Sequence, residues 1–325
     1  MHRITRRALT LTLLACAGAA LAQPKPPFPE GPLKIVVPFA PGGGVDSAAR
    51  LIAKQLGTNL KVPVIVENKP GANGSVGGKF VQTAHPDGQT LLFSASTQAL
   101  VNQVMAAPPY DPVSDFAPVA RVGAAPLLMV ISPMLPQAKL SEVIAAARQQ
   151  PDKWTAALPA LGAASHLGTL MVARQGGLTQ LTTAVYKGTA PALTDVAGGH
   201  VQIQIDAIVS LQSMAKAGKV KPVMVTSAKR SAVMPHVPTA VESGYPKFVT
   251  ESWYGMWAPR ATPADRVQFL NKAVNEAVSQ LAKSGAFEPL GIEPVTESVE
   301  DFRKYMVGYV AESSDLLRGA GFKPE

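Results

Sequence analysis

The sequence predicts an α/β protein of two domains, whose doubly wound sheets are joined by two crossing strands. Three observations lead to this fold class. Short apolar runs of strand length alternate with amphipathic stretches of helix length along most of the chain. The first apolar run leads through a glycine-rich turn directly into a helical pattern. After removal of a predicted export signal, about 303 of the 325 residues remain. This length exceeds the usual size of a single domain with one hydrophobic core.

The elements are expected in the following order. The predicted strands cover residues 35–39, 62–67, 90–94, 127–132, 182–186, 201–206 and 220–226, and the predicted helices cover residues 47–56, 75–84, 141–149, 166–175, 190–197 and 263–284. Such alternation is typical of parallel, doubly wound layers. Two further segments, residues 116–126 and 250–259, are extended in character and are predicted to cross between the domains. The first domain then contains residues 23–124 and 250–325, and the second contains residues 125–249.

The first 22 residues have the pattern of a cleavable export signal. A basic stretch with Arg6 and Arg7 precedes an apolar core that is too short to span a bilayer, and an Ala-Leu-Ala cleavage pattern ends before Gln23. The paired arginines fit either a twin-arginine signal or an ordinary secretory signal. We expect a periplasmic protein released by cleavage after residue 22, with a lipoprotein anchored through Cys16 as the alternative.

The composition argues against several classes of protein. Cys16 is the one cysteine of the sequence, so a chain cleaved after residue 22 has no disulfide and no thiol nucleophile. The formal net charge of +8 is spread along the chain, and no basic run is interleaved with aromatic residues, which argues against nucleic-acid binding. No apolar window after the signal reaches transmembrane length without a break. We therefore expect a soluble monomer without a cofactor.

The turn at Gly42, Gly43 and Gly44 joins the first predicted strand to the first predicted helix. Backbone N–H groups and the positive end of a helix dipole point at one place in such a turn, which favours a small anion. The turn is not a dinucleotide fingerprint, because Ser47 stands where the third glycine is required, and no P-loop lysine follows. A tight turn that only packs the strand against the helix is the alternative.

Several longer motifs resemble the Bug receptors, the solute-binding proteins of the tripartite tricarboxylate transporter family. The motifs are VPFAPGGGVD at residues 37–46, VENKPGANG at 66–74, HPDGQTL at 85–91, YDPVSDF at 110–116 and YKGTAPA at 186–192. They follow the family's order, and with later stretches they cover essentially all of the mature chain. The resemblance implies a Venus-flytrap periplasmic binding protein. Such a protein closes on a small carboxylated solute and delivers it to a membrane permease, without catalysis.

The resemblance also implies which residues bind the ligand. In the first domain they are Phe39, Ala40, Pro41, Gly43, Gly44 and Asp46 after the first strand, and Ser94, Ser96 and Thr97 in a second loop; in the second domain they are Gly162, Ser165, His166, Tyr186, Lys187, Gly188 and Asp206. These residues lie where predicted strands end or helices begin, the usual edge for ligands in α/β folds. Residues 158–164 are more apolar than the family pattern. We therefore expect a solute that is less polar than a tricarboxylate.

These residue types suit a carboxylate ligand, and alternatives stay open at several of them. Ser165 is suited to cap the helix at His166, and its hydroxyl can also bind a carboxylate oxygen. His166 either donates to a ligand or bonds a backbone carbonyl. Asp46 is expected to cap its helix and orient the glycine turn, whereas Asp206 can accept a hydrogen bond from a ligand hydroxyl or ammonium group. Lys187 either pairs with the ligand or is solvated.

Two other functions remain as alternatives. A secreted hydrolase would use Ser213 and Lys216, which match an S-x-x-K pattern, but such short matches are common and no G-x-S-x-G occurs. Metal binding is not expected, because the mature histidines are far apart in sequence. A sensor adaptor that docks on a membrane signalling protein needs the same ligand-driven closure as a transport receptor. The sequence does not separate these last two roles.

Overall fold

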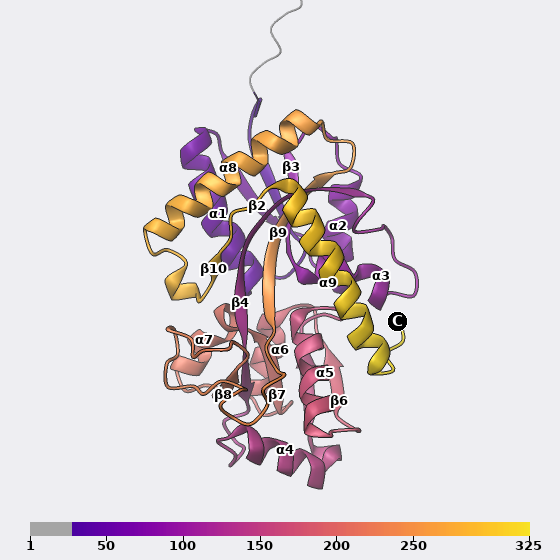
Figure 1. Cartoon of the computed structure of the whole chain (residues 1–325), viewed down its shortest axis with the longest axis vertical. Coiled ribbons are helices and arrows are strands. Elements are labelled where there is room, and N and C mark those ends of the chain that lie inside the picture. The colour runs from indigo at the N-terminus through magenta and orange to yellow at the C-terminus, as the bar shows by residue number, and fades with distance from the viewer. Residues whose placement is uncertain (1–27) are drawn as a thin grey trace, which may run out of the picture.

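The computed structural model describes residues 28–325, so the predicted export signal and Cys16 lie outside the described residues. The strands form two sheets that share one long strand (Figure 1). In chain order they are β1 (Leu33–Val37), β2 (Val64–Asn68), β3 (Thr90–Ala95), β4 (Phe116–Ile131), β5 (Thr155–Leu158), β6 (Thr182–Val185), β7 (Ile203–Ala207), β8 (Lys221–Val225), β9 (Glu251–Pro259) and β10 (Glu293–Pro294). We call the part of the molecule around the first sheet the first lobe, and the part around the second sheet the second lobe.

Each sheet combines parallel strands with antiparallel crossing strands. The first sheet has the order β2–β1–β3–β9–β4, with β10 added at β4, and the second has the order β4–β7–β5–β6, with β8 added at β4. Strands β1, β2 and β3 are parallel to one another, as are β5, β6 and β7. In contrast, β4 and β9 run antiparallel to their neighbours.

The helices cover both faces of the sheets. They are α1 (Gly44–Leu60), α2 (Ser75–Gln82), α3 (Val101–Val104), α4 (Leu140–Gln149), α5 (Ala164–Gly176), α6 (Thr189–Ala197), α7 (Ile208–Lys216), α8 (Ala264–Lys283) and α9 (Val299–Gly319). None of these helices is both long and apolar enough to cross a membrane.

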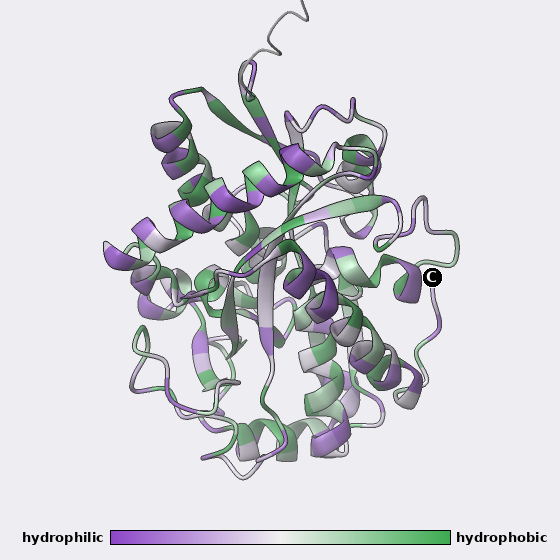
Figure 2. Cartoon of the chain, turned by 45° about the horizontal axis from the view of Figure 1, so that its top comes forward, coloured by the Kyte–Doolittle hydropathy of each residue, from purple (hydrophilic) through white to green (hydrophobic). Residues whose placement is uncertain are grey.

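The first sheet buries alternate residues against different helices, because neighbouring side chains of a strand point to opposite faces. Ile35 of β1 and Leu91 of β3 belong to the core under α1 and α8. Val36 and Leu92, one residue later, belong to a second apolar cluster with Phe302 of α9. The surface helices alternate between hydrophilic and hydrophobic residues, as Figure 2 shows for the helices that face the viewer. Apolar burial on both faces therefore holds this sheet between two helical layers.

The lobes are connected by two adjacent segments, where crossing strands are predicted. Residues 116–126 of β4 pair with β9 in the first sheet, and residues 127–131 pair with β7 and β8 in the second. The second connection enters β9 at Glu251, opposite Pro126 of β4. Just before it, the N–H of Thr250 donates to the carbonyl oxygen of Thr226 at 3.4 Å. The chain thus passes between the lobes through two neighbouring strands (Figure 1).

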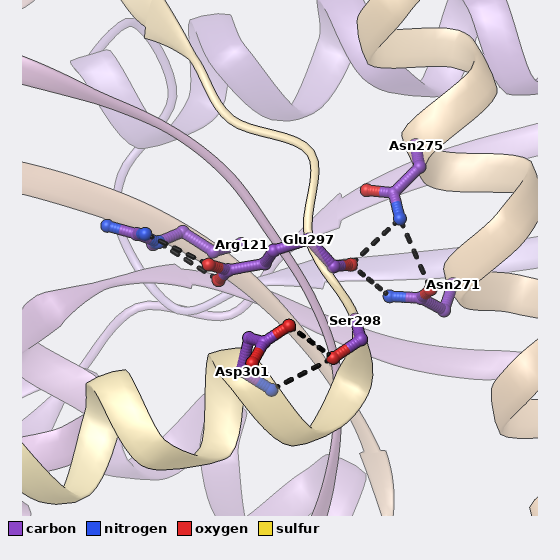
Figure 3. A network of polar contacts seen from close by, with 6 residues as sticks. All are labelled: Arg121, Asn271, Asn275, Glu297, Ser298 and Asp301. Atoms are coloured by element: carbon purple, nitrogen blue, oxygen red, sulfur yellow. Dashed lines mark hydrogen bonds and ion pairs between the residues drawn. The ribbon is translucent and has the colours of Figure 1, made fainter.

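A polar network holds β4 against the C-terminal helices (Figure 3). The Arg121 guanidinium of β4 donates twice to the Glu297 carboxylate, at 3.0 Å for each bond. Asn271 and Asn275 of α8 donate to the Glu297 carbonyl oxygen at 3.1 and 2.9 Å. The next residue, Ser298, caps α9. These contacts fix the start of α9 relative to α8 and to the strand shared by both sheets.

Several elements differ from the sequence prediction. Helix α9 is absent from the predicted set although it is one of the longest, and the short strand β5 is also absent. Helix α1 begins at Gly44, three residues before its predicted start, because Gly43 occupies the N-cap position. The C-terminal half of α9 descends beside α5, so this helix contacts both lobes (Figure 1).

Candidate functional site

A cavity lies between the lobes, at the carboxyl ends of parallel strands of both sheets. This is the edge at which α/β sheets bind ligands. Half of the predicted ligand-binding residues line it: Phe39, Ala40, Gly43, Gly44, Asp46, Thr97, Gly188 and Asp206. The other lining residues are mostly small, among them Ala95, Pro159, Ala160, Ala163, Ala164 and Ala207. The structure therefore brings together predicted residues that are up to 167 positions apart in the chain, from Phe39 to Asp206.

Four helices begin at this cavity. The N-terminal residues Gly44 of α1, Ala164 of α5 and Thr189 of α6 line it, and so does Ala207, the N-cap of α7. Each of these helices has at least nine residues. The first N–H groups of a helix have no partner within the helix, and its dipole is positive at that end. The convergence of four such ends favours an anion, and no lysine or arginine is among the lining residues within the described chain.

Asp46 does not oppose this positive potential, because its charge is already balanced. Its carboxylate accepts hydrogen bonds from the Arg50 side chain and the Gly42 N–H, both at 3.0 Å, and from the Asn68 side chain at 2.9 Å. Burial raises the pKa of Asp46, but these three bonds outweigh burial and hold it below its ordinary value. The bond from Gly42 fixes the glycine turn, so Asp46 shapes the turn that precedes α1.

Asp206 is the one acidic lining residue of the described chain without a cationic partner. It is 9% exposed, and its carboxylate accepts a bond of 2.5 Å from the Thr189 hydroxyl and one of 2.8 Å from the Ala207 N–H. Burial raises the pKa of Asp206 to about 6, although both hydrogen bonds act in the opposite direction. A protonated Asp206 can donate to a ligand oxygen, and an ionised Asp206 can accept from a ligand donor.

The lobes touch each other at the rim of the cavity. The N–H of Gly44 donates to the hydroxyl of Ser210 in the second lobe at 2.9 Å. A Cβ atom placed on Gly44 would lie 2.5 Å from that hydroxyl oxygen, whereas one on Gly43 would meet nothing nearer than 3.9 Å. Gly44 is therefore required for the close approach of the lobes. We call this arrangement, with the lobes in contact at Gly44 and Ser210, the closed arrangement.

Two predicted residues line a neighbouring cavity instead. Tyr186 and Lys187 face a second hollow, which shares Phe39, Pro159 and Ala160 with the first. The Tyr186 hydroxyl donates to the Asp195 carboxylate at 2.8 Å. Burial, followed by this acidic partner, raises the pKa of Tyr186 to about 12. This hydrogen bond fixes Tyr186 to α6, in the lining of the neighbouring cavity and not of the first.

The remaining predicted residues lie outside the lining of the first cavity. Pro41 is exposed on the turn. Ser94, Ser96 and Ser165 are fully buried, and their hydroxyls have no hydrogen-bond partner among residues 28–325. The interpretation of Ser165 as a helix cap is wrong, because α5 begins at Ala164 with its N-cap one residue earlier.

His166 and Gly162 form a local contact behind the start of α5. The Nδ1 atom of His166 accepts a hydrogen bond from the Gly162 N–H at 3.2 Å, so the ring bonds a backbone N–H rather than a carbonyl. Burial lowers the pKa of His166 to about 4. The ring packs edge-to-face on Phe322, with a centroid separation of 5.0 Å. His166 is therefore neutral at physiological pH.

Four polar lining residues are absent from the predicted set: Thr189, Ser210, Ser252 and Tyr254. Thr189 directly follows Gly188 in a recognised motif, so its place at a helix start was a usable signal. Ser210 belongs to α7, which has no marked start in the sequence. Tyr254 lies on β9, where every residue after Glu251 is buried and no alternation reveals which side chains face the cavity. Its hydroxyl has no hydrogen-bond partner among the described residues.

The S-x-x-K pair does not take part in the cavity. Ser213 and Lys216 are exposed on α7, and the Lys216 ammonium donates to Gln212 at 3.0 Å. In residues 28–325 no group of three or more histidine, cysteine, aspartate or glutamate side chains is placed to hold a metal ion.

Two sheets joined by crossing strands, with a cavity of helix N-termini between them, define a two-domain solute-binding protein. The chain belongs to the family described as "Tripartite tricarboxylate transporter family receptor", which matches residues 48–322. It is 33% identical to protein BugT of Bordetella pertussis over 312 residues, which cover 95% of both chains. Both the resemblance to Bug receptors and the predicted fold class are confirmed.

Solved structures agree with this assignment. A protein of Rhodopseudomonas palustris solved with adipate has a TM-score of 0.88 and 31% identity, and the match covers 92% of this chain and 100% of that one. MatC of the same species, solved with bound malate, has a TM-score of 0.83 and 32% identity, covering 89% and 100% of the two chains. Members of the receptor family are periplasmic solute-binding proteins.

Proposed function

We propose that this receptor captures a small carboxylate in the cavity between its lobes and delivers it to a tripartite membrane transporter. The convergence of four helix N-termini on a cavity without lysine or arginine is the observation that carries the proposal. Unpaired N–H groups at helix starts bind carboxylate oxygens well. Two relatives hold dicarboxylates, adipate and malate. The receptor binds its solute and does not transform it.

Closure of two domains accompanies capture in this proposal. Residues 23–124 and 250–325 move as one domain and residues 125–249 as the other, because the chain passes between the sheets at the two connections near β4 and β9. A ligand that contacts both lobes stabilises the closed form over the open one. Tyr254 contacts the ligand near the glycine turn, since its hydroxyl would lie 3.2 Å from a Cβ atom on Gly44. Asp206 bears on which acids are accepted.

The exported chain meets this ligand in the periplasm. Residues 1–22 direct export and are removed, and the mature receptor acts as a monomer that docks on a membrane permease in its closed form. The small, mostly apolar wall favours acids with fewer charges than a tricarboxylate.

A thermal-shift measurement tests the proposal. The mature chain, residues 23–325, is unfolded and refolded to remove carried-over ligand, and its melting temperature is measured with malate, adipate, amino acids, aromatic acids and the matching amides. A ligand at 100 times its Kd stabilises the folded state by about 2.7 kcal/mol, which raises the melting temperature by several degrees. An acid should produce this shift and its amide should not. Equal shifts for acid and amide, or no shift with any acid, would contradict the proposal.

A further inference from the structure

The loop before α2 has an unusual backbone. Four consecutive residues have positive φ angles: Gly71 (138°), Ala72 (43°), Asn73 (55°) and Gly74 (90°). Glycine adopts such angles without cost and asparagine tolerates them, but alanine does not. Backbone strain of this kind persists only where the surrounding structure requires it, and it clusters at functional segments.

This loop reaches across to the second lobe. The side-chain oxygen Oδ1 of Asn73 accepts a hydrogen bond from the backbone N–H of Leu161 at 3.1 Å. No other acceptor of the Leu161 N–H is present in the described part of the chain. The bond joins residues 88 positions apart and belongs to the closed arrangement of the lobes.

On the first lobe, the loop packs against the strand end that leads to the glycine turn. A Cβ atom on Gly74 would lie 3.2 Å from the ring of Phe39, and one on Gly77, in the first turn of α2, would lie 2.9 Å from the backbone of Pro38. Phe39 lines the ligand cavity. The position of the loop is therefore coupled directly to the ligand-binding side of the first lobe.

On the second lobe, Leu161 belongs to the segment that leads from β5 into α5. Pro159 and Ala160, just before Leu161, line the ligand cavity, and Ala163 is the N-cap of α5. The Leu161 side chain is 5% exposed and packs in an apolar cluster with Leu317 of α9. A hydrogen bond to the Leu161 N–H therefore holds one wall of the cavity and one of its four helix ends.

We propose that Asn73 is a positioning residue of the receptor, whose side chain holds the wall of residues 159–163 in its ligand-binding place when the lobes close. This inference rests on the proposed function, because it assigns Asn73 a role in ligand capture without contact to the ligand. The positive φ angles turn the loop so that the Asn73 side chain points across the cleft. The strained φ angles of this loop are tolerated because they allow the hydrogen bond between Asn73 and Leu161, which forms in the closed receptor.

Three substitutions separate the side chain from the backbone. Asn73→Gly keeps the positive φ angle at no cost but removes the acceptor. Asn73→Asp keeps an oxygen acceptor and also tolerates the backbone angle. Ala72→Gly loosens the same loop while leaving Asn73 in place, and it is the matched control for flexibility. If position 73 matters only through its backbone φ angle, Asn73→Gly should behave like the wild type.

Hydrogen exchange of the Leu161 amide is the first measurement, and it is made with a saturating acid ligand, because the bond to Asn73 forms in the closed receptor. We expect exchange about fivefold to tenfold faster in Asn73→Gly than in the wild type, with Asn73→Asp and Ala72→Gly within twofold of it. Melting temperatures should agree within about 2 °C among the four proteins. Equal Leu161 exchange in the wild type and Asn73→Gly would overturn the inference.

Affinity for malate and adipate is the second measurement. The better of the two acids should bind Asn73→Gly about fivefold to tenfold more weakly, mainly through faster dissociation, and Asn73→Asp should retain the wild-type value. Wild-type binding with unchanged affinity in Asn73→Gly would overturn the inference and leave the proposed function standing. Failure of the wild type to bind either acid would count against the proposed function and against this inference, which rests on it.

Discussion

Replacement of Asp206 by asparagine should stabilise the unliganded receptor at neutral pH and leave its stability nearly unchanged at pH 4. Burial raises the pKa of Asp206 from 3.8 to about 6, so the folded state carries a proton here that the unfolded chain has already released. Between these two values the folded state binds more protons than the unfolded state. The contribution of Asp206 to stability is therefore lost as the pH rises from about 4 to above 6.

The size of the effect follows from the same pKa values. Each pKa unit corresponds to about 1.4 kcal/mol, so the ionised Asp206 costs the folded state about 3 kcal/mol. Asparagine has nearly the same shape and retains an acceptor for the Thr189 hydroxyl or the Ala207 N–H, but it carries no charge. Asp206→Asn should therefore gain up to about 3 kcal/mol at pH 7.5.

His166 has the opposite effect over nearly the same pH range. Burial lowers the pKa of His166 from 6.5 to about 4, so the unfolded state binds more protons between these values. The stability supplied by the neutral ring is lost as the pH falls from above 6.5 to 4 and amounts to about 3 kcal/mol. In the wild type the contributions of His166 and Asp206 largely cancel. In Asp206→Asn, stability should rise steadily with pH.

Urea unfolding at pH 4.0, 5.0, 6.0 and 7.5 measures these changes in the free energy of unfolding. Asp265→Asn, at an exposed position in the first turn of α8, is the control and should differ from the wild type by less than about 0.5 kcal/mol at each pH. The reasoning is refuted if Asp206→Asn is no more stable than the wild type at pH 7.5. A difference of the same size at pH 4.0 and 7.5 would also refute it.

Three further predictions concern the cavity and the connection between the lobes. Gly44→Ala should weaken acid binding at least tenfold, because its Cβ would lie 2.5 Å from a hydroxyl oxygen of the other lobe and would block closure. Gly43→Ala is the control and should bind acids as the wild type does. Equal Kd values for the two variants in titration calorimetry would contradict the closed geometry. Tyr254→Phe removes a buried hydroxyl that has no hydrogen-bond partner among the described residues. Calorimetry should therefore show weaker acid binding, with no loss in melting temperature. A lower melting temperature with unchanged acid binding would exclude a ligand contact. Arg121→Met leaves Glu297 unpaired and should cost about 2 kcal/mol in urea unfolding, and a cost below about 0.5 kcal/mol would show that the network adds little.

The fold could be predicted from the sequence because its signals are local. The glycine turn and the apolar run before it identify the junction of β1 and α1, and the long motifs identify the family. Helix α9 also had a local signal, since Ser298 is a good cap and Phe302, Met306 and Leu317 recur at helical spacing and are all buried. The sequence therefore carries the signal for α9, although this helix is absent from the predicted set.

The composition of the cavity wall was less predictable, because it depends on how two distant segments meet. Ser96 and Thr97 are neighbours in one short turn, yet only Thr97 lines the cavity. Asn73 and Leu161 meet only when both lobes are in place. Local patterns identify helix starts, but they do not tell which side chains of a turn face the opposite lobe.

The main chain supplies the positive potential of this cavity, and this has a consequence for how such receptors diversify. Backbone dipoles are present whatever side chains surround them, and they do not titrate at physiological pH. Substitutions in the wall can therefore exchange one acid for another without loss of anion binding. Ala160, Ala163 and Ala164 are small, line the cavity and carry no charge. A library limited to these three positions is the shortest route to a receptor with a new acid preference on an unchanged scaffold.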